Sequence, residues 1–157
     1  MEFPYKAIGF DWAYTLVDLG AEDDRRPLKR VFALLQKNKI ALPDFETCLE
    51  KSRELFKAMI VLSRTTDREA RYEEVLKYLL FYFKIAWSGR VTFKEMIEVY
   101  YKAVYQERKI FPEVVAVLKQ LSQWRVPMGI ISNTTNPVSM KELELEGSGL
   151  KAYFDFT

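Results

Sequence analysis

Two short apolar segments near the ends of the chain, separated by a long stretch with helical periodicity, constrain its fold more than any other feature. The first, residues 5–11, ends in Asp11, and the second, residues 126–131, is followed by Ser132 and Asn133. Both segments are short for a helix, and the second is apolar without alternation, which is typical of a strand buried on both faces. We therefore expect a parallel α/β sheet that is built from both ends of the chain.

The segment between these strands is predicted to be a helical bundle over residues 27–107. Apolar residues recur there at intervals of three and four, the spacing that places them on one face of a helix. These faces include Leu28, Leu35, Leu49, Phe56, Leu76, Leu80, Ile97 and Tyr101. Thr66-x-x-Glu69 and Thr92-x-x-Glu95 each predict a helix start, because a hydroxyl and a carboxylate at this spacing form a capping box.

The C-terminal part of the chain is predicted to return to alternating helices and strands. Pro112 suits the first turn of a helix that continues to about Trp124. A short amphipathic helix is expected around residues 138–146, and residues 153–157 look like the opening of another strand. This alternation is typical of an α/β core.

The composition excludes several classes of function. Lys and Arg number 24 against 22 Asp and Glu, an excess too small for a protein that binds nucleic acid by neutralising phosphates. One cysteine, Cys48, and no histidine exclude a disulfide framework, a Cys/His zinc site and a histidine-dependent triad. The sequence has no apolar run of membrane-spanning length and no signal-peptide pattern, so we expect a cytoplasmic protein without membrane or nucleic-acid partners.

Asp11 and the pair Ser132-Asn133 are the positions at which chemistry is expected. Ligands of parallel α/β sheets bind at the carboxyl ends of the strands, where these residues stand. A carboxylate and a hydroxyl placed there can flank a phosphoryl group, the first as nucleophile and the second as hydrogen-bond donor. Taken alone, each residue is equally typical of a turn or a helix N-cap, so the residues by themselves leave both interpretations open.

Four segments together resemble the haloacid dehalogenase-like (HAD) hydrolase superfamily. The family's first motif, an apolar strand followed by Asp-x-Asp-x-Thr-Leu, is similar to residues 8–16. Its second motif, an apolar strand followed by Ser/Thr-Asn, is similar to residues 129–133. The Phe-Pro-x-Val entry at residues 111–114 and the Leu-x-x-Tyr-Phe-Asp at residues 150–155 also fit the family pattern.

The resemblance implies a three-layer Rossmann-like core with a parallel sheet, formed by residues 1–18 and 110–157, and an inserted helical C1-type cap, residues 19–109. The family's third motif, a lysine, and its fourth, one or two acids, lie beyond the third strand and are absent from this chain. Lys141 and Lys151 are candidate substitutes for that lysine, although a solvated role is expected for each. The core is therefore expected to be incomplete, with an open sheet edge that recruits another copy or a complementary chain.

By the same resemblance, Asp11 would attack phosphorus to form an aspartyl-phosphate, Ser132 would bind the phosphoryl group, and Asn133 would shape the pocket. Mg²⁺ would be held by Asp11 and by the backbone carbonyl of Ala13. The implied function is a Mg²⁺-dependent phosphatase that acts on a small phosphorylated metabolite.

Three further residues are candidates for the substrate site. Trp12 either walls the pocket or packs against the cap, and the hydroxyl of Thr15 would brace the loop after Asp11. Arg68 carries a guanidinium group that suits a phosphate or carboxylate, although Arg beside Glu on a helix is also typical of an exposed charge network.

Ala13 departs from the family pattern, because family phosphatases carry there the acid that protonates the leaving group. Loss of a general acid typically costs about 10²–10⁴-fold in rate. Alternatives therefore stay open: a non-catalytic HAD-like binding or interaction domain, one half of a split hydrolase, a phosphonatase or a dehalogenase. A phosphonatase would need a cap lysine, for which Lys51 and Lys57 are candidates, and a histidine-bearing signature that this chain lacks. The dehalogenase motif places an aromatic residue where Ala13 stands.

Overall fold

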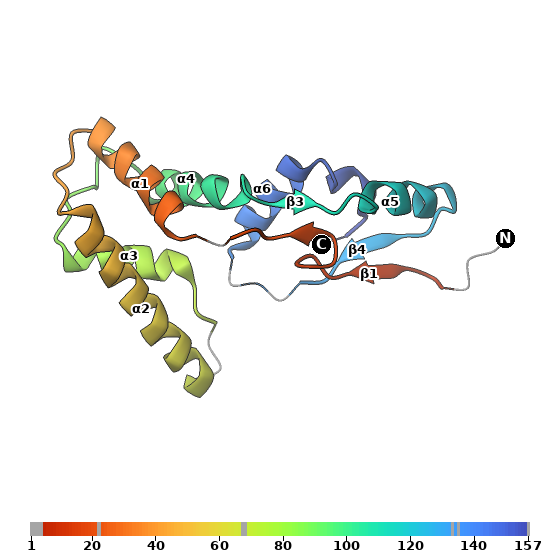
Figure 1. Cartoon of the computed structure of the whole chain (residues 1–157), viewed down its shortest axis with the longest axis horizontal. Helices are drawn as coiled ribbons and strands as arrows, with labels where there is room; N and C mark the ends of the chain where they lie inside the picture. The colour runs from red at the N-terminus through yellow and green to blue at the C-terminus, as the bar shows by residue number, and fades with distance from the viewer. Residues whose placement is uncertain (1–4, 22, 67–68, 133, 135, 157) are drawn as a thin grey trace. The chain divides into compact units, whose positions relative to one another are not determined.

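The computed structural model divides the chain into two compact units (Figure 1). Unit 1 comprises residues 1–22, 105–134 and 141–157, and unit 2 comprises residues 23–104 and 135–140. The structure describes residues 5–21, 23–66, 69–132, 134 and 136–156. None of the helices formed by these residues is long and apolar enough to cross a membrane.

The sheet of unit 1 is built from both ends of the chain, as the sequence predicts. β1 (Ile8–Phe10) pairs in parallel with β4 (Met128–Ile130), with Ile8 opposite Met128 and Phe10 opposite Ile130. Phe156 extends the sheet through an isolated parallel bridge to Gly129, with backbone hydrogen bonds on both sides of it, so the described residues include the beginning of the expected third strand. The fold is thus a mixed α/β fold with a small parallel sheet, consistent with an incomplete Rossmann-like core.

A second, antiparallel pair was not predicted from the sequence. β2 (Val17–Asp18) pairs with β3 (Lys109–Ile110), with Val17 opposite Ile110. Strands of two residues carry no readable hydrophobic periodicity, which explains why the sequence does not reveal them. The pair brings the chain segment that leaves the core next to the segment that returns to it.

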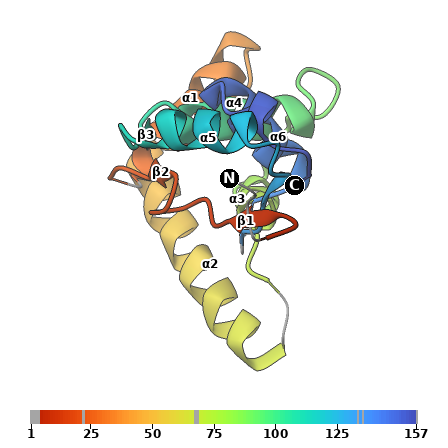
Figure 2. The same ribbon diagram turned by 90° about the vertical axis from the view of Figure 1, so that its right-hand side faces the viewer.

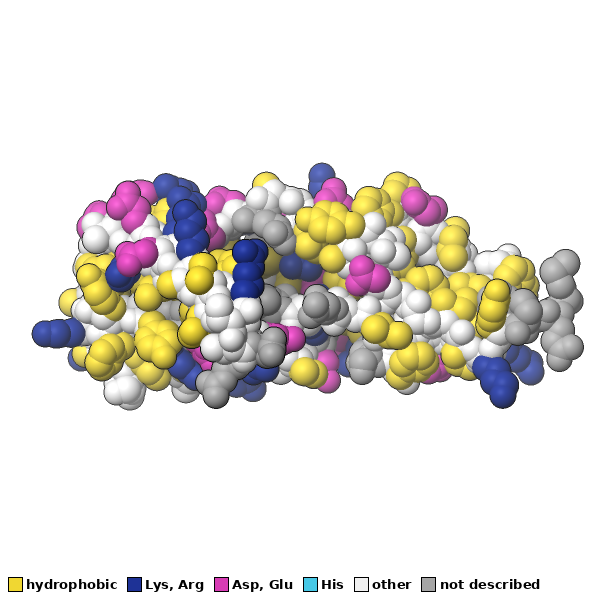
Figure 3. All heavy atoms as spheres, turned by 90° about the horizontal axis from the view of Figure 1, so that it is seen from below, with side chains coloured by type: hydrophobic (Ala, Val, Ile, Leu, Met, Phe, Trp, Pro, Cys, Tyr) yellow, Lys and Arg dark blue, Asp and Glu magenta, His cyan; other side chains and the backbone are white. Residues whose placement is uncertain are grey.

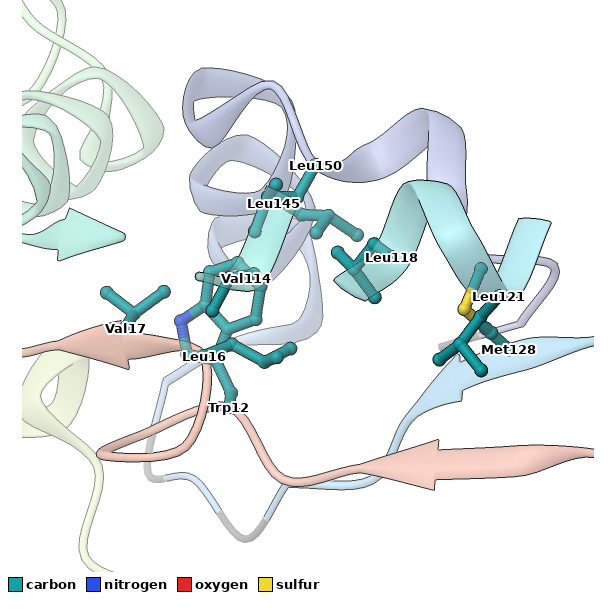
Figure 4. Packing of buried hydrophobic residues seen from close by; sticks show 9 residues of the cluster. All are labelled: Trp12, Leu16, Val17, Val114, Leu118, Leu121, Met128, Leu145 and Leu150. Carbon is teal, nitrogen blue, oxygen red and sulfur yellow. The ribbon is translucent and has the colours of Figure 1, made fainter. Parts of the chain in front are cut away.

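The core of unit 1 lies between the loop after β1 and three helical elements (Figure 4). These are α5 (Val114–Gln123), α6 (Val138–Ser148) and the 3₁₀ turn η1 (Lys151–Tyr153). The predicted helices at Pro112–Trp124 and residues 138–146 are both present. The buried cluster consists of Trp12, Leu16, Val17, Val114, Leu118, Leu121, Met128, Leu145 and Leu150. Burial of each such side chain contributes about 1.5–3 kcal/mol, so this cluster provides most of the apolar stabilisation of unit 1.

Unit 2 is helical, as the spacing of its apolar residues predicts. It contains α1 (Arg25–Lys37), α2 (Phe45–Thr66), α3 (Tyr72–Tyr82) and α4 (Phe93–Tyr105). Within this unit α2 packs against α3. Figure 2 shows α2 along its length and α3 nearly end-on. The buried residues of α1 are Pro27, Leu28, Val31, Phe32 and Leu35, and the last four have the i, i+3, i+4, i+7 pattern of a single face.

The two predicted capping boxes have different outcomes. At the start of α4 the amide of Thr92 donates to Glu95 Oε2 (2.7 Å), and the amide of Glu95 donates to Thr92 Oγ1 (3.2 Å). This capping box is therefore confirmed. The prediction at Thr66 is wrong, because Thr66 is the last residue of α2 and its hydroxyl donates back to the carbonyl of Leu62 (2.8 Å).

Large hydrophobic side chains are also exposed on both units. Tyr14 in unit 1 and Phe81 in unit 2 are examples. Figure 3 shows hydrophobic side chains interspersed with charged ones over the face that it draws. Scattered exposure of this kind is ordinary for a folded protein and identifies no site.

Candidate active site

The pairing of β1 with β4 brings Asp11 and Ser132 to the same edge of the sheet. Asp11 follows β1 directly, and the amide of Ile131, the first residue after β4, donates to the carbonyl of Phe10 (2.9 Å). Ser132 comes one residue later. The Asp11 side chain is exposed and Ser132 is half-buried. The strand-end placement expected for the two residues is therefore present.

The loop after Asp11 is a tight turn held by backbone hydrogen bonds. The carbonyl of Trp12 accepts from the amides of Leu16 (3.0 Å) and Val17 (3.2 Å), and the amide of Tyr14 donates to the carbonyl of Val17 (2.8 Å). Tyr14 has a φ of 59°, a left-handed conformation that is unfavourable for a residue with a side chain. Such a conformation persists only where the surrounding structure fixes it, so the loop is held in one shape.

Asp11 is fixed at the entrance to this turn. Its Oδ1 accepts a hydrogen bond from the amide of Trp12 (2.8 Å). Its Oδ2 accepts none from the residues that the structure describes. One carboxylate oxygen is thus oriented by the backbone, while the other faces solvent at the edge of the sheet.

Trp12 lies in the core of unit 1, with only 2% of its surface exposed (Figure 4). Its indole Nε1 donates to Glu144 Oε1 (2.9 Å). A buried indole ring contributes a large apolar area, and its N–H then needs a hydrogen-bond acceptor. The Trp12 ring is buried and its N–H has the acceptor Glu144. The expectation that Trp12 walls a substrate pocket requires an accessible ring face, so the structure replaces this expectation with a role in the core.

Glu144 is the centre of a buried polar network that the sequence did not reveal. Besides Trp12, it accepts hydrogen bonds from Arg108 Nη1 and from Lys141 Nζ, the latter at 2.9 Å. The side chain of Glu144 is 3% exposed, that of Arg108 10% and that of Lys141 21%. Arg108 also stacks over the ring of Tyr105, 5.0 Å from its centroid. The Lys141-x-x-Glu144 spacing indicates an ion pair between neighbouring turns of a helix. The contacts of Glu144 with Trp12 and Arg108 come from distant segments and depend on the fold.

Lys141 differs from the solvated residue expected on an amphipathic helix. Its ammonium lies 5.6 Å from the centroid of the Trp12 ring, a cation–π arrangement. Burial lowers the pKa of Lys141 and the positive charge of Arg108 lowers it further, while the hydrogen bond that Lys141 donates to Glu144 and the negative charges of Glu144 and Asp11 raise it. The side chain is therefore held over the ring of the residue that follows Asp11.

The remaining predicted residues are placed as follows. Thr15 is exposed in the turn after Asp11, and the predicted bracing by its hydroxyl stays a prediction. Lys151 is exposed and forms an ion pair with Glu146, as expected for a solvated residue. Asn133 and Arg68 lie outside the described residues.

The residues implied as ligands of Mg²⁺ do not by themselves fit that ion. Mg²⁺ requires near-octahedral oxygen ligation, usually from one or two carboxylates, waters and substrate phosphates. Here the donors are the exposed carboxylate of Asp11 and the carbonyl of Ala13. Over the described ranges, no group of three Asp, Glu, Cys or His residues is arranged to hold a metal.

Comparison of the sequence with models of protein families tests the resemblance that the motifs suggested. The model described as haloacid dehalogenase-like hydrolase matches residues 34–157. The chain belongs to the haloacid dehalogenase-like hydrolase family. This confirms the resemblance drawn from the sequence motifs, and the match includes Ser132 but begins after Asp11. A search of the curated proteins found no match.

Solved structures of phosphatases and dehalogenases are similar to this chain at low sequence identity. A HAD phosphatase from Thermococcus onnurineus is 21% identical, with a TM-score of 0.50, and the match covers 97% of this chain and 60% of that structure. A predicted phosphoglycolate phosphatase from Haemophilus somnus 129pt is 17% identical, with a TM-score of 0.47 and coverages of 97% and 61%. L-2-haloacid dehalogenase from Xanthobacter autotrophicus is 18% identical, with a TM-score of 0.46 and coverages of 96% and 55%. The chain thus spans less than two thirds of the length of each.

Proposed function

We propose that this haloacid dehalogenase-like hydrolase cleaves phosphate esters of small molecules with Asp11 as the nucleophile. The observation that carries the proposal is the shared sheet edge, where an exposed carboxylate and a half-buried hydroxyl, that of Ser132, follow paired parallel strands. A carboxylate with one oxygen oriented by a backbone amide keeps its second oxygen directed outward for attack. The helices of unit 2 are proposed to form the cap that selects the substrate.

In the proposed reaction an Asp11 oxygen attacks phosphorus. An oxygen–phosphorus bond to Asp11 forms, the bond to the leaving oxygen breaks, and the leaving group departs with the electron pair. The Ser132 hydroxyl donates a hydrogen bond to a non-bridging oxygen, where charge is concentrated. Water then hydrolyses the aspartyl-phosphate, which releases phosphate and restores the carboxylate.

Ala13 determines which leaving groups this arrangement favours. A methyl group carries no proton, so the residue after Trp12 cannot protonate a departing alkoxide. Phosphate esters with acidic alcohols or phenols, which depart as stable anions, are therefore the proposed substrates. The same observation supports a second candidate, hydrolysis of a carbon–halogen bond by Asp11, because a halide departs without a proton.

Mg²⁺ is proposed as the cofactor on the strength of the family resemblance. Since the described residues supply one carboxylate and one carbonyl, further ligands would be required, and none of the steps above is assigned to the metal. Assays with and without added Mg²⁺ measure its contribution directly.

Turnover of p-nitrophenyl phosphate by wild-type protein and by Asp11→Asn tests the proposal. Asp18→Asn is the matched control, because the Asp18 carboxylate accepts from the amide of Gly20 in a neighbouring turn (3.0 Å). We expect Asp11→Asn to lose turnover by at least about 10²-fold and Asp18→Asn to retain it. Halide release from 2-chloropropionate, lost in the same variant, would favour the second candidate. Turnover unaffected by Asp11→Asn, or absent for both substrates, would point to the non-catalytic domain.

A further inference from the structure

We propose that Glu144 is the positioning residue of this site, which holds Trp12 and Lys141 so that the Lys141 ammonium, which lies over the ring of the residue after Asp11, binds an anionic group of the substrate. The inference rests on the proposed function for its catalytic consequence. Its structural basis is independent of any activity. Three donors from three separate segments, the loop after β1, the segment before β3 and helix α6, converge on one carboxylate.

The geometry joins Glu144 to Asp11 along a short path. Glu144 Oε1 accepts the indole N–H of Trp12, and the amide of Trp12 in turn donates to Asp11 Oδ1. Glu144 Oε2 accepts from Lys141 Nζ (2.9 Å), and the same ammonium lies over the Trp12 ring. A single carboxylate therefore fixes both the residue that orients Asp11 and the ammonium that lies over the ring of that residue.

The charges of the network explain why a cation is available for substrate. A buried carboxylate must be paired, and here Glu144 faces two cations, Arg108 and Lys141. The three groups carry one net positive charge, which the carboxylate of Asp11 offsets in the free protein. An anionic substrate that approaches Asp11 would be repelled by that carboxylate alone. The excess positive charge at Lys141 opposes this repulsion.

Glu144 also keeps Lys141 in place against the cost of burial. Burial lowers the pKa of Lys141, and the hydrogen bond and charge of Glu144 act in the opposite direction. Without that carboxylate, a half-buried ammonium would lower its free energy by turning toward water. Glu142, two residues away on the same helix, is exposed and provides a matched control.

The indole N–H of Trp12 gives a readout that does not require activity. The chain has three tryptophans, so its indole resonances are few, and Trp12→Phe assigns the one of interest. In Glu144→Gln we expect this resonance to shift and its hydrogen exchange to accelerate about tenfold or more, because a hydrogen bond to a charged acceptor becomes one to a neutral amide. Glu142→Gln should leave both unchanged. An unchanged indole in a folded Glu144→Gln protein would overturn the positioning role.

Binding of inorganic phosphate, followed through the same indole resonance, tests the anion-binding role. Lys141→Met keeps Glu144 paired with Arg108 and the indole, so it is a second variant if Glu144→Gln does not fold. We expect phosphate affinity to fall about tenfold in Lys141→Met and to recover in Lys141→Arg, with Lys151→Met as the unaffected control. Equal affinity in wild type and Lys141→Met, or no phosphate binding by wild type, would overturn this role.

The two proposals fail in different ways. If the proposed function is right, Lys141→Met also raises KM for p-nitrophenyl phosphate more than it lowers kcat. If the protein has no turnover but binds phosphate through Lys141 with a protected Trp12 indole, the proposed function is contradicted and the present inference stands.

Discussion

Two adjacent residues of α5 provide a sharp test of how unit 1 is packed. Val117 and Leu118 are both apolar, but the structure exposes 48% of Val117 and none of Leu118. Leu118 belongs to the buried cluster, whereas Val117 lies outside it. Truncation of each to alanine should therefore have very different consequences.

The magnitudes follow from these exposures. Leu118→Ala loses the transfer free energy of a fully buried side chain, about 1.5–3 kcal/mol, and leaves a cavity that adds to the loss. We expect the free energy of unfolding to fall by about 3–5 kcal/mol. Val117→Ala loses part of two half-exposed methyl groups and gains helix propensity, so we expect a change within about 0.5 kcal/mol.

Urea denaturation followed by tryptophan fluorescence measures both changes. In a Trp87→Phe background the two remaining tryptophans, Trp12 and Trp124, both lie in unit 1 and report on its unfolding. Leu118→Ala should lower the midpoint by about 1–3 M urea, and Val117→Ala should leave it near that of the parent protein. Equal losses in the two variants, or a larger loss in Val117→Ala, would refute the packing described for this core.

Three further predictions concern helix ends and burial. Thr92→Ala should cost about 1 kcal/mol in urea denaturation followed by circular dichroism, because it removes the capping box of α4, whereas Thr65→Ala, near the end of α2, should be nearly neutral. Gly147→Ala should stabilise the protein by about 0.5–1 kcal/mol in the same assay, because the added Cβ meets nothing within 4 Å and the residue lies inside α6. Gly149→Ala should destabilise the protein by about 1 kcal/mol, because Gly149 has a φ of 74°. A more stable Gly149→Ala than Gly147→Ala would contradict these backbone conformations. Burial, with a smaller contribution from a nearby carboxylate, raises the pKa of the Cys48 thiol to about 11. The contribution of this thiol to the free energy of unfolding should therefore be constant below its unfolded pKa of about 8.5 and decline as the pH rises from there toward 11. Native protein at pH 8 should also react with a thiol reagent far more slowly than urea-unfolded protein.

The fold was predictable wherever a local pattern determines it. The helices of unit 2 follow from apolar residues at intervals of three and four, and the parallel pairing follows from two short apolar segments that each precede a polar residue. The failed capping box at Thr66 shows the limit of such patterns. A Thr-x-x-Glu sequence fits a helix start, but the same hydroxyl can donate to the carbonyl four residues earlier and lie at a helix end.

The candidate site was predictable only in part, for a related reason. Asp11 and Ser132 were found because strand ends are recognisable in sequence and because both fit family motifs. The network around Glu144 was not found, because its partners lie 132 and 36 residues away along the chain and meet only in the folded core. Trp12 illustrates the same point, since its position beside Asp11 suggested a pocket wall while its ring belongs to the core.

The central claim is that Asp11 becomes covalently phosphorylated, and mass spectrometry of protein quenched in acid during turnover of p-nitrophenyl phosphate tests it most directly. We expect a phosphoryl adduct on the peptide that contains Asp11 in wild-type protein, and neither adduct nor turnover in Asp11→Asn. Turnover that continues in Asp11→Asn, or an adduct on a different residue, would contradict the account.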